Sequence, residues 1–166
     1  MKLNIASVLK NDGASRQFSG IVELGTFDFM GSTLEFKDPL EVVGEVQNIG
    51  GALEISAKIQ GEYFTSCSCC GRDVNEKLSL DLFESVPDDF SDVDEECISL
   101  SGTVLDISGS IEACIFNNLP MRFLCREDCK GLCPHCGIDL NKNECNCEDE
   151  VYDPRFAIFR KLSKEV

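Results

Sequence analysis

The feature that most constrains this chain is a dense run of cysteines. Six cysteines fall within the 23 residues from Cys125 to Cys147. Within this run, Cys133 and Cys136 are separated by two residues and followed by Gly137. At that spacing a tight turn directs both sulfurs toward one tetrahedral ion, and the glycine lets backbone N–H groups approach the sulfur. The run therefore predicts a structural zinc site.

A tetrahedral site needs two further ligands, and the run offers two pairs. Cys145 and Cys147 are the first choice, because residues i and i+2 of an extended segment point to the same side. The eight-residue loop after Cys136 is long enough to return the chain. Cys125 and Cys129, one helical turn apart, are the alternative pair. We expect about one zinc ion per chain. The expected ligands are Cys133, Cys136, Cys145 and Cys147.

The compartment decides whether such a run binds metal or forms disulfides. Residues 1–10 have no continuous apolar stretch typical of a signal peptide, and no apolar run of the chain is long enough to cross a membrane. A cytoplasmic location is therefore expected. In that reducing compartment clustered cysteines favour metal binding, and disulfides are the competing interpretation.

A second CxxC pair, Cys67 and Cys70, follows a predicted strand and precedes Gly71. This thiol pair has three interpretations: it completes a distant metal site, acts in redox chemistry, or closes a hairpin. Thioredoxin-like chemistry requires the motif at a helix N-terminus after a parallel strand, whereas the flanking segments here have antiparallel character. Another cysteine, Cys114, lies on the apolar face of a predicted helix and is interpreted as a core residue.

Hydrophobic periodicity predicts the fold class. Apolar and polar residues alternate over 33–37, 53–60 and 78–83, and Gly50-Gly51 is a hairpin signal. We expect a mainly β protein whose antiparallel sheet is sandwich- or barrel-like, with a short helix and a small C-terminal zinc-binding module. The expected division is an antiparallel β domain over 1–120, a cysteine-rich zinc-binding module over 121–150 and an amphipathic helix over 151–166.

Two segments of this division have alternative interpretations. The acidic loop near 87–96 holds six acidic residues, which favours a solvated loop but is also compatible with a docking surface for a basic partner. The short helix near 106–118 is expected to begin with Asp106 as its N-cap and to end before Pro120. The helix over 151–166 either folds back on the domain or docks into a partner's groove.

Charge restricts the partners. The chain has 30 acidic and 15 basic residues, a formal net charge of −15. Binding to nucleic acid draws most of its affinity from basic side chains that neutralise phosphates, so this charge favours a basic protein partner. Direct RNA binding would need a local basic patch, for which Arg122, Arg126 and Lys130 are the candidates.

The sequence offers little for catalysis. It contains no P-loop, no GxGxxG that opens a helix and no GxSxG, and its only histidine, His135, lies inside the Cys133–Cys136 turn. A nuclease would need carboxylates on a rigid scaffold, whereas the dense carboxylates here lie in the acidic loop. We therefore expect no enzyme, with a nuclease or a thiol oxidoreductase as the less favoured alternatives.

Several motifs together resemble the YceD family, whose name describes large ribosomal RNA subunit accumulation. They are Leu119-Pro120-Met121, Cys125, Cys129 through Gly137, Leu140-Asn141, Cys145-Asn146-Cys147, Asp153-Pro154-Arg155-Phe156 and the earlier pair Cys67 and Cys70. The resemblance implies a bacterial role in accumulation or processing of large-subunit ribosomal RNA. It also implies an association with a basic large-subunit ribosomal protein or a pre-ribosomal particle. It supplies no catalytic residues. The expected function is a non-catalytic ribosome-biogenesis factor, with a direct RNA-binding zinc-knuckle module as the alternative.

Overall fold

A computed structural model describes residues 1–87 and 97–147 of the chain. Nine strands and two helices occur in these two ranges. In chain order the elements are β1 (Lys2–Asn4), α1 (Ala6–Leu9), β2 (Ser15–Val22), β3 (Thr26–Phe29), β4 (Ser32–Glu35), β5 (Leu40–Ile49), β6 (Ala52–Ser66), β7 (Asp73–Val86), β8 (Ser99–Ser101), β9 (Val104–Asp106) and α2 (Ser108–Asn118).

Two antiparallel sheets make up the fold. The larger sheet has the order β2-β5-β6-β4-β3, and β7 pairs with β6 along its other edge. The smaller sheet has the order β1-β9-β8. The prediction of a mainly antiparallel β protein is confirmed. Within the described ranges β2 pairs with β5 alone, so the larger sheet is open rather than closed into a barrel.

The hairpin between β5 and β6 is the one that the glycine pair predicts. Gly50 and Gly51 both have positive φ, 63° and 99°, as a two-residue turn of type I′ requires. The turn sets a register in which Val46 faces Ile55 and Val42 faces Ile59. Alternate residues of both strands therefore enter the core, and their neighbours lie on the outer face.

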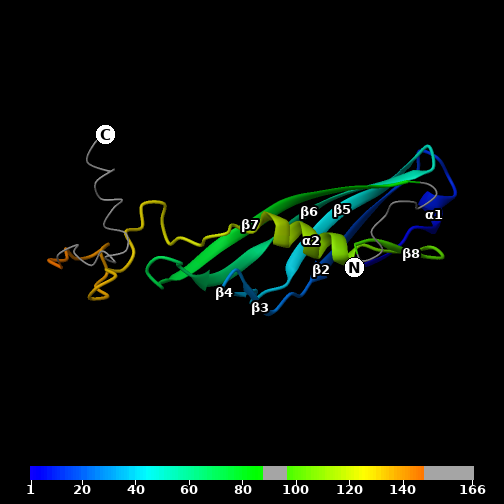
Figure 1. Cartoon of the computed structure of the whole chain (residues 1–166). Coiled ribbons are helices and arrows are strands. Elements are labelled where there is room, and N and C mark those ends of the chain that lie inside the picture. The colour runs from blue at the N-terminus through cyan, green and yellow to red at the C-terminus, as the bar shows by residue number, and fades with distance from the viewer. Residues whose placement is uncertain (88–96, 148–166) are drawn as a thin grey trace, which may run out of the picture.

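Helix α2 covers the inner face of the larger sheet (Figure 1). Ile111 and Ile115 are fully buried in the core, and the ring of Phe116 meets that of Phe27 edge-on with centroids 5.0 Å apart. The predicted N-cap is wrong by one residue. Ile107 is the N-cap, and Asp106 accepts the N–H of Ser108 at 3.0 Å from one position earlier.

Some expectations fall on residues outside the described ranges. They are the acidic loop from residue 88 onward and the amphipathic helix over 151–166.

Neither α1 nor α2 has the length and apolar composition that a membrane crossing requires. Helix α1 has only four residues and no side-chain cap, so no periodicity in the sequence indicates it.

Strands β6 and β7 form a long hairpin that extends beyond α2 (Figure 1). Its far end carries Cys67 and Cys70, which follow the last residue of β6. The cysteine-rich segment lies at this same end of the molecule, drawn from yellow to orange in Figure 1. The fold therefore brings two distant parts of the sequence to one tip.

Candidate metal centres

The tip of the β6–β7 hairpin is a CxxCG turn. Cys67 donates its N–H to the Arg72 carbonyl at 2.7 Å and accepts the N–H of Gly71 at its own carbonyl at 2.9 Å. Gly71 has a φ of 69°, a conformation that glycine adopts without steric cost. This turn places the Cys67 and Cys70 sulfurs on the same side, and both residues are buried.

The segment after α2 returns to this turn. Ser68 donates its N–H to the Phe123 carbonyl at 2.7 Å, and Leu132 donates its N–H to the Cys69 carbonyl at 3.2 Å. Between these two contacts lie Cys125 and Cys129, whose sulfurs are thereby held against those of the hairpin tip. We call this set the hairpin cluster. Its members are Cys67, Cys70, Cys125 and Cys129.

A second group of four sulfurs lies in the cysteine-rich segment itself. Cys133 and Cys136 form another CxxCG turn, in which Gly137, with a φ of 73°, donates its N–H to the Cys133 carbonyl at 2.9 Å. The chain then returns through a bridge between Leu132 and Asp139. We call this set the knuckle cluster. Its members are Cys133, Cys136, Cys145 and Cys147.

The sulfur positions fit one tetrahedral ion in each cluster. In each group of four, all sulfurs lie within 4.8 Å of one another. Neighbouring sulfurs are 3.6 and 3.8 Å apart in the hairpin cluster and 3.4 and 3.5 Å apart in the knuckle cluster. A Zn–S bond of about 2.3 Å gives tetrahedral edges of about 3.8 Å. A disulfide needs about 2.05 Å, and the eight cysteines of these two groups are not disulfide-bonded.

Ionisation of the thiols is uneven within each cluster. Burial opposes ionisation of Cys67, but backbone N–H groups, that of Cys125 foremost, lower its pKa to about 6. Backbone N–H groups, that of Cys136 foremost, lower the pKa of Cys133 to about 6 as well. Burial, together with the neighbouring thiols, raises the pKa of Cys125 to about 12, and the Cys145 thiol raises that of Cys147 to about 12. At least one thiolate forms readily in each group, and a central divalent cation would remove the penalty for the others.

Polar contacts tie the two clusters together. Arg72, beside the hairpin tip, forms an ion pair of 2.9 Å with Asp139 in the knuckle loop. Asn141 donates from its side-chain nitrogen to the Cys129 sulfur at 3.5 Å and accepts the N–H of Lys130 at 2.8 Å. The Nε atom of Arg72 is buried without a partner among the described residues. These contacts hold the loop of one cluster against the other.

The structure brings the predicted cysteines together in two groups of four. The first-choice set comes together in the knuckle cluster. The alternative pair, Cys125 and Cys129, instead meets Cys67 and Cys70, for which completion of a distant metal site is one of the three interpretations from the sequence. The arrangement therefore has room for two ions rather than one. One sequence signal could have indicated this: the two turns share the pattern CxxCG, so each has equal claim to a site of its own.

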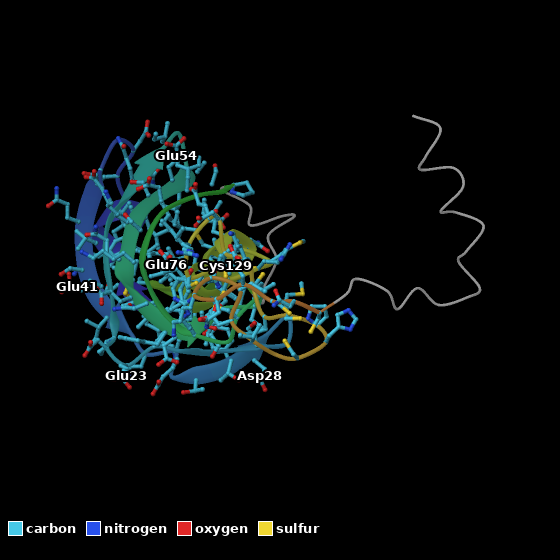
Figure 2. The ribbon with its side chains drawn as sticks, turned by 90° about the vertical axis from the view of Figure 1, so that its left-hand side faces the viewer. Glu23, Asp28, Glu41, Glu54, Glu76 and Cys129 are labelled. Carbon is cyan, nitrogen blue, oxygen red and sulfur yellow. The ribbon has the colours of Figure 1, made fainter. Side chains whose placement is uncertain are left out.

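The remaining candidates lie outside the two clusters. His135 lies between the two cysteines of the Cys133–Cys136 turn and is exposed. Cys114 packs partly against the core from α2. Among the basic candidates, Arg122 donates to the Cys69 sulfur at 3.2 Å, and Arg126 forms an ion pair with Asp128 at 3.2 Å. The sulfur atoms in Figure 2 gather in the yellow and orange part of the chain, where Cys129 is labelled.

Comparison with known proteins gives distant relatives. The uncharacterized proteins Mb2951c of Mycobacterium bovis and Rv2926c of Mycobacterium tuberculosis are each 26% identical over 117 residues, 68% of this chain and 56% of theirs. The match therefore spans about half of their length. The large ribosomal RNA subunit accumulation protein YCED homolog 1, chloroplastic, of Arabidopsis thaliana is 31% identical over 62 residues, 37% of this chain and 19% of that protein. No solved structure matches.

The family comparison covers more of the chain than the Arabidopsis match. The model described as large ribosomal RNA subunit accumulation protein YceD matches residues 55–163. This range begins in β6 and includes all eight cysteines of the two clusters. The resemblance inferred from the motifs is confirmed: this chain belongs to the YceD family.

Proposed function

We propose that this protein is a non-catalytic, cytoplasmic ribosome-biogenesis factor that supports large-subunit RNA accumulation by binding a basic large-subunit ribosomal protein. The observation that carries the choice of partner is the distribution of charge. Residues 1–120 carry 21 acidic and 7 basic side chains, whereas residues 121–147 carry four of each. A strongly acidic β domain attracts a basic protein and repels RNA phosphates.

The chemistry of the cysteine clusters supports a structural role for zinc. Four cysteine ligands fill a tetrahedral zinc site and leave no position open for water or substrate. Bound zinc would supply cross-links between chain segments, and each site of four thiolates and one divalent ion would carry a net charge of about −2. The residues of the hairpin cluster would fix the cysteine-rich segment to the β6–β7 hairpin. No step of a reaction is assigned to either cluster.

Direct RNA binding is the second candidate, and its basic patch is weak. The three candidate cations lie near the hairpin cluster, but Arg126 is paired with Asp128, and the surrounding segment is balanced in charge. RNA binding through phosphates would need several cations that act together. This arrangement therefore favours the protein partner.

Affinity capture with a nuclease arm tests the proposal. The full chain is immobilised and incubated with bacterial lysate, either untreated or treated with ribonuclease. We expect a basic large-subunit ribosomal protein to be retained in both arms, because protein contacts do not depend on RNA. The purified pair should then associate without RNA. Loss of all retained ribosomal proteins after ribonuclease, with tight binding to naked large-subunit RNA at physiological salt, would overturn the proposal.

A further inference from the structure

The outer face of the larger sheet carries a groove that the cysteine clusters do not explain. The groove has a volume of about 720 Å³ and crosses β2, β5, β6 and β7. Two rows of outward side chains form its walls, following the strand register. One wall runs from Glu45 through Ser56 to Phe83, and the other from Val43 through Lys58 to Asp81.

The floor of the groove is backbone, because the residues between the two walls turn toward the inner face of the sheet. Gly44 and Ala57 are paired in the register at the centre of the groove, and the backbone there is not covered by side chains of the outer face. Gly44 is also required by the inner face, where a Cβ would lie 2.4 Å from the Ser56 carbonyl oxygen. The hollow is therefore a consequence of how the strands pack.

Apolar side chains are exposed on both walls. Phe83 is 67% exposed and Val43 is 59% exposed, although Phe and Val are among the residue types most often buried. Ile21, 63% exposed, lies in the next row of the same face, paired with Glu41. Scattered apolar residues are normal on a surface, but Phe83 and Val43 lie on the two walls of one groove.

Carboxylates surround these apolar groups. Glu41 and Glu45 flank Val43 along β5, and Asp81 precedes Phe83 by two residues on β7. Among the described residues, Lys58 is the one basic side chain that lines the groove. Figure 2 labels Glu41 on the side of the sheet that faces away from α2. The groove therefore presents negative charge around an apolar centre and would repel RNA phosphates.

We propose that this groove is the docking site for a lysine- or arginine-rich protein segment that also carries apolar side chains, an inference that rests on the proposed function and locates its partner surface. Apolar residues of the segment contact Phe83 and Val43, and its cations pair with the carboxylates of the walls. Crossing four strands spaced about 4.8 Å apart takes about 15 Å, the length of about five extended residues.

A peptide probe tests the chemistry of the groove with the full zinc-loaded chain. The probe is a fluorescent peptide of about eight residues that alternates lysine and leucine, and its affinity is measured by anisotropy at physiological salt. We expect Phe83→Ser to weaken binding about tenfold, as for truncation of a central interface aromatic. Glu45→Gln should weaken peptide binding less than Phe83→Ser does. The effect of Glu45→Gln should be larger at low salt, where charges are screened less.

The matched control is Met30→Ser, because Met30 is 70% exposed on the β3–β4 turn, outside the groove. Circular dichroism confirms that each variant is folded. Equal affinities of the Phe83→Ser and Met30→Ser variants for the peptide would overturn the inference. So would tighter binding of a short single-stranded RNA than of the peptide.

A second probe separates this inference from the proposed function. It is the RNA-free protein extracted from purified large ribosomal subunits. We expect the unmodified chain to bind a basic protein from this mixture and Phe83→Ser to weaken that binding about tenfold. Unchanged binding by Phe83→Ser would refute the groove and leave the proposed function standing. No binding by the unmodified chain would refute both.

Discussion

At the scale of single residues, the turns that present the cysteines depend on backbone conformation as much as on sulfur. Gly71 and Gly137 follow the two CxxC pairs with φ near 70°, and each closes its turn by donating to the carbonyl of the first cysteine. The same hydrogen-bonded turn at both sites lets backbone N–H groups face the thiolates. The local sequence CxxCG is thus sufficient to build half of each cluster.

Ligand substitution tests whether the two clusters bind separate ions. Cys70→Ser removes one ligand from the hairpin cluster and should lower the zinc content from about two ions per chain to about one, because each ion needs its own four ligands. Cys136→Ser should have the same effect through the knuckle cluster. Elemental analysis of purified protein measures the content.

Cys114→Ser is the control for these substitutions, because Cys114 lies on α2 outside both clusters. Its zinc content should equal that of the unmodified chain. An unmodified chain that holds a single zinc ion, or whose thiols are disulfide-bonded in fresh lysate, would contradict the assignment of two sites.

Gly131 tests how closely the cysteine-rich segment approaches the hairpin tip. Its φ is 74°, and a Cβ there would lie 3.0 Å from the Cys69 carbonyl oxygen. Gly131→Ala therefore combines the cost of a left-handed conformation, about 1–2 kcal/mol, with a steric contact against backbone. We expect a lower melting temperature and zinc release at lower chelator concentration.

Gly102→Ala is the matched control for Gly131→Ala. Gly102 also has a positive φ, 63°, but a Cβ there would meet nothing within 4 Å. It lies in the turn between β8 and β9, away from the clusters. The control should lose stability from the backbone conformation alone and keep its zinc affinity. Equal zinc release in the two variants would show that the close approach at Gly131 has no role.

At the scale of elements, the β6–β7 hairpin connects the β domain to the cysteine-rich segment. Phe123 is buried at 2% exposure and contacts the Tyr63 ring of β6 edge-on, with centroids 5.8 Å apart. It belongs to the main hydrophobic core, while the residues just after it join the hairpin cluster. The apolar contact of Phe123 therefore anchors the cysteine-rich segment independently of any metal ion.

Metal removal should reveal this division between elements. The segment that carries the knuckle cluster, residues 133–147, has few buried apolar residues. Chelation should therefore unfold it, because small metal sites couple metal binding to local folding. The far end of the β6–β7 hairpin should also lose protection, since two ligands lie there. Strands β5 and β6 near Ile55 and Ile59 should stay protected, because these side chains are fully buried.

Hydrogen exchange with mass spectrometry, with and without chelator, measures each element in the same sample. We expect fast exchange over 124–147 and near residues 66–73, and unchanged exchange at the centre of β6. Loss of protection throughout the larger sheet would show instead that the metal sites and the β domain form one cooperative unit.

An element could be predicted from the sequence where the interactions that form it join residues close together in the chain. The β5–β6 hairpin was predictable because alternation and the Gly50-Gly51 turn are local. The start of α2 was misplaced by one residue because Asp106 bonds the helix from before the N-cap. The knuckle ligand set was chosen from spacing within 15 residues. Spacing does not indicate the hairpin cluster, because Cys70 and Cys125 lie 55 residues apart in the sequence and are brought together by tertiary contacts such as that of Ser68 with Phe123.

At the scale of the whole molecule, the excess of acidic charge and the cysteine clusters lie in different parts of the chain. The acidic excess belongs to the β domain, whereas the cysteine-rich segment is balanced before its thiolates are counted. The groove on the outer face of the sheet and the two clusters at the hairpin tip are therefore different surfaces with different electrostatics. The acidic residues would guide the proposed basic partner, while metal bound in the two clusters would hold the far end of the molecule together.

Neutralising the acidic segment tests this long-range attraction. Asp88, Asp89, Asp92, Asp94, Glu95 and Glu96 carry six of the 30 acidic side chains. Replacing them with Asn or Gln should slow association with a basic ribosomal protein, because charges at the rim of an interface act mainly on the association rate. The dissociation rate should change little. The difference should fade at about 1 M salt, where the Debye length is about 3 Å.

The sign of the same change separates the two partner classes. If the ligand is RNA, removing acidic side chains reduces repulsion and speeds association, while Arg122→Ala or Lys130→Ala weakens binding. Stopped-flow or biolayer interferometry with the purified partner measures both rates. A matched variant with three amides at Glu127, Asp128 and Glu144, compared with three at Asp92, Asp94 and Glu95, tests position at constant charge. We expect the second set to slow the basic protein more, because it belongs to the acidic domain. Faster, tighter binding of large-subunit RNA by the neutralised chain would place the function with RNA.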